Sequence, residues 1–176
     1  CGALRRDQVL PLRSGADDLP EGSGPVDGSP AQFQIANPVT GGHAIRFDRP
    51  ANKYITSGPH DVFAASLEMV ETFSQAAEKA ICEGQLKTLA VSKYLGIVAI
   101  GINGCYGFRK KQEAIKVLPK VVDSIHPGDR VLLLLDGDIS SNPRVSGAGV
   151  ELAQLVLSRG AIPVIPQLPM TKRGEI

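Results

Sequence analysis

The chain has 176 residues, which is enough for about one domain with a core of its own. Hydrophobic residues make up 43% of it and charged residues 21%, the usage of an ordinary globular protein, and this excludes a wholly disordered chain. The longest apolar run, residues 131–135, is far too short to span a membrane, and the formal net charge of +1 excludes a strongly basic nucleic-acid coat while allowing a local basic patch.

The first thirty residues are rich in Gly, Pro, Ser and Asp, a composition that buries too little apolar surface to offset the entropy of ordering. We therefore expect residues 1–30 to be a linker or an extended N-terminal segment, and residues 31–176 to form the folded domain. Apolar and polar residues alternate at 33–35 and 44–47, with turn-forming residues between them. This pattern predicts a small antiparallel β lead-in to the domain.

Beyond residue 60 the pattern alternates between helices and strands. An amphipathic helix is expected over residues 63–77, with Asp61 as its cap. The strands that follow are expected at 80–82, 97–102, 131–135 and 162–168, and the helices at 85–95, 113–125 and 143–159. Such an alternation predicts an α/β fold of the Rossmann-like kind, with a mostly parallel central sheet flanked by helices. Pro163 and Pro166 place the last strand at an edge of that sheet.

Cysteine and histidine usage bears on compartment and on zinc. The three cysteines have no regular spacing, so they form no disulfide framework, and Cys82 with Cys105 is the only plausible pair. The three histidines are isolated and no Cys-x-x-Cys lies near them, so zinc is not predicted. The sequence begins with Cys rather than Met and shows no signal-peptide pattern. We expect a cytoplasmic domain that is a piece of a longer protein.

Acidic side chains follow two of the expected strands. Glu83 comes directly after the strand at 80–82, and Asp136 and Asp138 come after the strand at 131–135. Ligands of such sheets bind outside the carboxyl ends of the strands, so the three carboxylates converge if these strands are neighbours. Crowded carboxylates repel one another and need a cation or shared protons. Mg²⁺, or Mn²⁺ in its place, suits these oxygen ligands best.

Each of these residues also has a purely structural interpretation. Glu83 is placed to cap the helix expected from residue 85, and Asp138 suits the turn before the helix expected from residue 143. Lys87 lies four residues beyond Glu83, on the same face of a helix. It is expected either to form a weak ion pair with Glu83 or to lie near a bound phosphate.

A basic stretch follows the second strand of the expected sheet. A basic face beside an acidic metal site suits a polyanion such as DNA or RNA, because lysines and arginines neutralise the phosphates that the metal does not contact. The alternative is a solvated helix face without a ligand. The residues of this stretch that we expect to contact nucleic acid are Arg109, Lys110, Lys111 and Lys116.

Taken together, these motifs resemble the Toprim domain that bacterial primases, topoisomerases and some nucleases share. They are more similar still to an uncharacterised branch of Toprim-like domains, found in replication proteins of phages, plasmids and other mobile elements beside primase or helicase modules. The stretches that carry the resemblance are residues 53–55, 81–90, 96–104, 135–138, 142–145 and 159–161. The sequence stops before an acidic stretch that such domains often carry after the last strand.

The resemblance implies a role for each acidic residue. Glu83, with Lys87 beside it, would serve as the general acid and base of a phosphoryl transfer, and Asp136 and Asp138 would hold magnesium. The partners implied are DNA or RNA and the other domains of a primase- or helicase-type protein. Two alternatives stay open: a non-catalytic Toprim module that binds DNA or a protein, and a small-molecule phosphatase or phosphotransferase with Asp136 as nucleophile.

Overall fold

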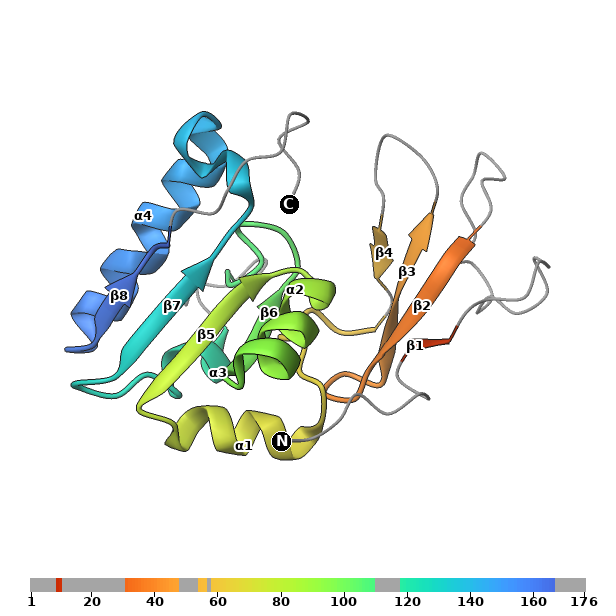
Figure 1. The fold of residues 1–176 in the computed structure, drawn as a ribbon, viewed down its shortest axis with the longest axis horizontal. Helices are drawn as coiled ribbons and strands as arrows, with labels where there is room; N and C mark the ends of the chain where they lie inside the picture. Colours follow the sequence, from red (N-terminus) through yellow and green to blue (C-terminus); the bar gives the residue numbers. More distant parts are fainter. Residues whose placement is uncertain (1–8, 11–30, 48–53, 57, 110–117, 167–176) are drawn as a thin grey trace.

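The computed structural model describes residues 9–10, 31–47, 54–56, 58–109 and 118–166, and these form two four-stranded sheets side by side (Figure 1). The first sheet is antiparallel, with its strands in chain order: β1 (Val9–Leu10), β2 (Ala31–Asn37), β3 (Gly42–Phe47) and β4 (Tyr54–Thr56). The second is parallel, in the order β6-β5-β7-β8: β5 (Glu78–Glu83), β6 (Val98–Ile102), β7 (Arg130–Leu134) and β8 (Ile162–Val164). The α/β fold and the antiparallel lead-in expected from the sequence are confirmed.

Helices cover both faces of the parallel sheet (Figure 1). They are α1 (Leu67–Gln75), α2 (Gln85–Ala90), the π-helical turn η3 (Val91–Leu95), α3 (Pro119–Val122), the 3₁₀ turn η4 (Gly137–Ser140) and α4 (Pro143–Ser158). Because side chains alternate along a strand, β5 faces two cores. Ile81 packs in the larger core with α1, α3 and α4, whereas Ala80 and Cys82 pack in a smaller one with Val91 of η3.

Three contacts hold the two sheets together. Phe63 and Gly101 exchange backbone hydrogen bonds of 2.8 and 2.7 Å, which form an isolated bridge to β6. Ile35 of β2, Phe63 and Leu89 of α2 make a buried apolar cluster. Asn37 Nδ2 also donates to the carbonyl of Val62 over 3.1 Å. The antiparallel sheet is therefore held against α2 and β6 of the other sheet.

The helix expected over residues 63–77 begins later than predicted. It starts at Leu67, and Ser66 rather than Asp61 is its cap, since Ser66 Oγ accepts from the Met69 amide over 3.2 Å. Asp61 instead accepts from the Val62 amide and pairs with Lys120. The pairing of Phe63 with β6 outweighs the local helical spacing.

The prediction of a helix over residues 113–125 was also wrong in its extent. In the described part of that range it covers only Pro119–Val122, and residues 110–117 lie outside the described residues. Leu118 is extended, with ψ of 129°, because the ring of a following proline disfavours the helical conformation. Pro119 therefore begins the helix instead of lying inside it.

The other helices and strands lie close to their expected positions. The helix predicted over 85–95 continues from α2 through η3 and ends at Gly96, whose φ of 66° suits glycine. Asn142 caps α4 by accepting from the Arg144 amide over 3.1 Å. The last strand, β8, is at the sheet edge as predicted, but it ends at Val164, earlier than expected. Residues 165–166 are not in a strand, and residues 167–168 lie outside the described residues.

Lys79 of β5 and Asp129, the residue before β7, form a buried ion pair that the sequence pattern did not indicate. The side chain of Lys79 in β5 is 0% exposed. Its Nζ atom lies 2.8 Å from Asp129 Oδ2 and donates to the carbonyl oxygens of Ser124, over 2.7 Å, and of Ser74, over 3.3 Å. The Phe73 ring adds a cation–π contact, with its centroid 5.3 Å from Nζ. Every proton of this ammonium group therefore has a partner.

The Asp129 carboxylate is expected to make folding stability depend on acid pH. Burial alone would raise its pKa, but the hydrogen bonds from Lys79 Nζ and the His126 amide outweigh burial and hold the pKa of Asp129 below its usual value. The stability contributed by this carboxylate is present above the ordinary Asp pKa of about 3.9 and is lost as pH falls through the lower folded-state value. Urea unfolding between about pH 6 and pH 2 should show a shallower pH dependence for Asp129→Asn. An unchanged slope in that variant would contradict the role of Asp129.

Candidate functional site

The acidic residues meet where β5 and β7 end. The two strands are parallel neighbours, with Cys82 of β5 opposite Leu134 of β7. Just beyond this pair, the amide of Asp136, two residues after Leu134, donates a hydrogen bond of 3.1 Å to Oε2 of Glu83, the last residue of β5. The neighbour relation on which the convergence of Glu83 and Asp136 depends is therefore present.

The surroundings of Glu83 disfavour the ionised form of its carboxyl group. Burial raises the pKa of its carboxyl above the usual value, and the charges of Asp136 and, more weakly, Asp138 raise it further. The hydrogen bond from the Asp136 amide and the charge of Lys87 lower it in part. A bound proton or a nearby cation would therefore stabilise this side chain.

Lys87 reaches across the edge of the sheet from α2. It forms an ion pair with Asp136 Oδ1, and the two side chains are 25% and 55% exposed. The ion pair expected from the sequence was with Glu83, four residues earlier, whereas Lys87 pairs with the carboxylate that follows β7. An ammonium group and three carboxylates thus share one edge of the sheet.

Asp138 is both a turn residue and a source of one unpartnered oxygen. It lies in η4, where its carbonyl accepts from the amides of Ser141 and Asn142 over 2.9 and 2.8 Å. Its Oδ2 accepts from Asn142 Nδ2 over 2.8 Å. Its Oδ1 is buried and has no hydrogen-bond partner. Since a buried acceptor without a donor is costly, this atom is suited to a ligand that supplies positive charge.

The site fits magnesium through its chemistry rather than through a closed cage. Across the described ranges, no three His, Cys, Asp or Glu side chains are grouped so that they hold one ion. Mg²⁺ usually takes only one or two protein carboxylates and completes its shell with water and phosphate. The orphaned Asp138 Oδ1 and the raised pKa of Glu83 both suit a cation here. Magnesium at this edge stays a prediction.

Of the four basic residues predicted to contact nucleic acid, Arg109 lies within the described residues. Arg109 is paired with Glu151 of α4, with 2.8 Å from Nε to Oε1, and its guanidinium lies 4.1 Å from the centroid of the Tyr106 ring. Lys110, Lys111 and Lys116 lie outside the described residues. Contact of this stretch with nucleic acid therefore stays a prediction, and in this structure the charge of Arg109 is matched by Glu151.

The two cysteines that the structure describes form no disulfide. Cys82 and Cys105 are buried free thiols, so the one plausible disulfide is not formed. Burial raises the pKa of the Cys82 thiol to about 12, which keeps it protonated and unreactive at neutral pH.

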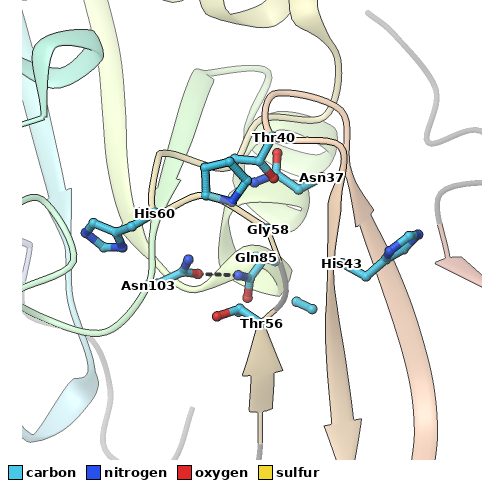
Figure 2. A pocket seen from close by; sticks show the side chains of 10 residues that line it. Asn37, Thr40, His43, Thr56, Gly58, His60, Gln85 and Asn103 are labelled. Atoms are coloured by element: carbon cyan, nitrogen blue, oxygen red, sulfur yellow. Dashed lines mark hydrogen bonds between the residues drawn. The ribbon is translucent and has the colours of Figure 1, made fainter. Parts of the chain in front are cut away.

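Sequence reasoning missed a polar pocket beside the acidic edge. Figure 2 shows it between the antiparallel sheet and the loops that follow β5 and β6. We call it the amide pocket, because the amide side chains of Asn37, Gln85 and Asn103 line it. Its lining also includes Thr40, His43 and His60. Gln85 and Asn103 each come shortly after a strand, and that position was the only signal in the sequence that pointed to them.

Comparison with known proteins adds little beyond the fold. No protein-family model matches this chain, and no curated protein does. The crystal structure of the Aquifex aeolicus primase (zinc-binding and RNA polymerase domains) is similar over 80% of this chain and 34% of that chain, with a TM-score of 0.49 and 17% sequence identity. This chain thus spans about a third of the length of that one. At this TM-score the likeness carries no argument about function.

The fold and the edge of the sheet together define a class of molecule. It is an α/β domain with a parallel sheet whose carboxyl edge carries Glu83, Asp136, Asp138 and Lys87. Within the described residues, no helix is both long enough and apolar enough to cross a membrane.

Proposed function

We propose that this chain is a Toprim-like domain that binds Mg²⁺ at its acidic edge and takes part in phosphoryl transfer on nucleic acid. The observation that carries the proposal is the 3.1 Å hydrogen bond from the Asp136 amide to Glu83, which joins the acidic ends of two adjacent parallel strands. The buried, unpartnered Asp138 Oδ1 supports a cation at the same edge. The resemblance in sequence supports a replication protein of the primase or helicase type, from a mobile element, with DNA or RNA as its partner.

The proposed mechanism divides the work among four side chains. Asp136 and Asp138 would hold the ion, which when bound would neutralise phosphate charge. Glu83 is suited to general acid–base work, because its raised pKa brings the carboxyl closer to the pH at which it both takes and gives a proton. Lys87, paired with Asp136 here, would balance the charge of an arriving phosphate.

Metal binding is the first test, measured by electron paramagnetic resonance of Mn²⁺ titrated into the protein. Asp138→Asn is expected to weaken Mn²⁺ binding by about tenfold or more, since loss of even an indirect partner of a metal costs about 10- to 100-fold in affinity. Excess Mg²⁺ should displace the Mn²⁺ from the wild type. The matched control is Asp123→Asn, which removes an exposed carboxylate at the end of α3 and should bind like the wild type.

The outcomes separate the proposal from its alternatives. Equal Mn²⁺ affinity in Asp138→Asn and the control would overturn the metal site. If the metal binds but nucleic-acid turnover is absent and Asp136→Asn keeps binding to DNA, the domain is a non-catalytic module. A phosphate trapped covalently on Asp136 would instead show a phosphotransferase that uses this residue as nucleophile.

A further inference from the structure

Asn142 lies between the start of α4 and the carboxylate of Asp138. It precedes Pro143, whose ring disfavours the helical conformation at this residue, and its φ of −102° and ψ of 105° are those of extended backbone. Its side chain is therefore placed as a helix cap, and it accepts from the Arg144 amide over 3.1 Å. The same side chain donates to Asp138 Oδ2 over 2.8 Å. One residue thus joins the start of a helix to a predicted metal ligand.

The two hydrogen bonds fix which end of the Asn142 amide faces Asp138. The backbone amide of Arg144 can only donate, so the atom that meets it is the side-chain oxygen Oδ1. The nitrogen Nδ2 then faces the carboxylate, which accepts its proton. The cap and the contact with Asp138 therefore use opposite ends of one side chain, and neither can be reversed without losing the other.

The turn between η4 and α4 also holds Asp138 by its backbone. The Asp138 carbonyl accepts from the amides of Ser141 and Asn142, over 2.9 and 2.8 Å, and from Ser141 Oγ over 3.2 Å. The next residue, Ile139, lies close against α4 at Gly149, where an added Cβ atom would be 2.9 Å from Ile139 Cδ1. Since the buried face of α4 belongs to the larger core, the Asp138 carboxylate is held by a rigid element.

The two oxygens of the Asp138 carboxylate are consequently unequal. Oδ2 has Asn142 Nδ2 as its partner, whereas Oδ1 is buried and, within the described residues, has no hydrogen-bond partner. The carboxylate therefore offers one oxygen to a cation rather than two. Mg²⁺ demands nearly ideal octahedral geometry with few protein ligands, whereas Ca²⁺ takes more oxygens and accepts both oxygens of one carboxylate.

We infer that Asn142 is a positioning residue that makes Asp138 a one-oxygen ligand, and that it thereby favours Mg²⁺ over Ca²⁺ at the acidic edge. The inference rests on the proposed function, and it deepens it by assigning the choice of cation to a residue that acts through Asp138. Partners of this kind fix the orientation of a metal ligand without contacting the metal.

The variant Asn142→Ser separates the two hydrogen bonds of this side chain. Serine caps helices about as well as asparagine, but it has no amide group to hold Asp138 Oδ2. Cation affinities are measured by electron paramagnetic resonance of Mn²⁺, which Mg²⁺ and Ca²⁺ each displace in separate titrations. In this variant the affinity for Mg²⁺ should fall about tenfold, and that for Ca²⁺ should fall less, because Oδ2 becomes free to bind it.

Three further variants separate this effect from a loss of helix stability. Asn142→Ala removes the cap as well as the donor, so it should lower the melting temperature and show the same shift toward Ca²⁺ as Asn142→Ser. The matched control, Ser66→Ala, removes the cap of α1 and should lower the melting temperature without changing the cation preference. Asn142→Gly, which weakens the cap only slightly, gives the same test if Asn142→Ser fails to fold.

The outcomes distinguish this inference from the proposed function. If Asp138→Asn weakens Mn²⁺ binding but Asn142→Ser keeps the wild-type ratio of Mg²⁺ to Ca²⁺ affinity, the role of Asn142 is overturned and the metal site stands. If the ratio shifts as expected but the chain shows no turnover of nucleic acid, the role of Asn142 stands and phosphoryl transfer falls. If Asp138→Asn binds Mn²⁺ like the wild type, both are overturned.

Discussion

A Lys79→Met variant is expected to lose about 3–5 kcal/mol of unfolding free energy, the usual effect of removing one partner of a buried ion pair. Methionine fills much of the same space, so the loss arises from electrostatics rather than from a cavity. The Lys79 side chain is 0% exposed, so its removal leaves the Asp129 carboxylate without a cation inside the protein. It also leaves the carbonyls of Ser124 and Ser74 without the donor that Lys79 supplies. Urea denaturation at neutral pH measures the change.

Arg130→Met is the matched control for this variant. Arg130 is the residue of β7 in register with Glu78, and its ion pair with Glu78 is exposed, with side chains 58% and 49% accessible. Removing such a pair costs less than about 1 kcal/mol. The double variant Lys79→Met with Asp129→Asn should recover part of the loss, because no buried charge is then left alone. Equal losses for Lys79→Met and Arg130→Met would contradict the buried pair.

A Gly101→Ala variant is expected to lower the unfolding free energy by about 1–3 kcal/mol through overpacking. A Cβ atom at this position of β6 would lie 2.5 Å from Thr88 Oγ1 and 3.3 Å from the Phe63 Cβ. Thr88 is fully buried and its hydroxyl donates to the Gly84 carbonyl over 2.9 Å, so it has little room to move. Thermal and urea unfolding measure the effect.

A double-mutant cycle with Thr88→Ala tests the cause. Thr88→Ala removes the atom that the new methyl group would meet, so Gly101→Ala should cost less in that background than in the wild type. Phe63 still lies close, and the rescue should therefore be partial. If Gly101→Ala costs the same in both backgrounds, contact with Thr88 is not the reason that glycine stands here.

Local patterns accounted for most of the parallel sheet and for its acidic edge. The apolar run that became β7 and the Asn142–Pro143 start of α4 are signals that lie within a few neighbouring residues. The placement of Glu83 and Asp136 after strands followed from those elements, and it needed only one tertiary fact, that β5 and β7 are parallel neighbours.

Where the sequence misled, a distant contact decided the outcome. Phe63 has the spacing of a helical core residue, yet it pairs with Gly101 of β6. Lys87 was expected either to pair with Glu83, four residues earlier, or to lie near a bound phosphate, and in this structure it pairs with Asp136, which follows β7. In each case the competing partner is far away in the chain, so no local pattern contains it.

The sequence by itself determined the alternation of strands and helices and the carboxylates at strand ends, because the periods of two and 3.6 residues and the capping signals are local. Only the tertiary structure decided that Lys79 is buried on Asp129, and that Gln85 and Asn103 meet in one pocket. These features depend on which strands become neighbours, and that choice comes from burying the whole apolar surface at once rather than from any one segment.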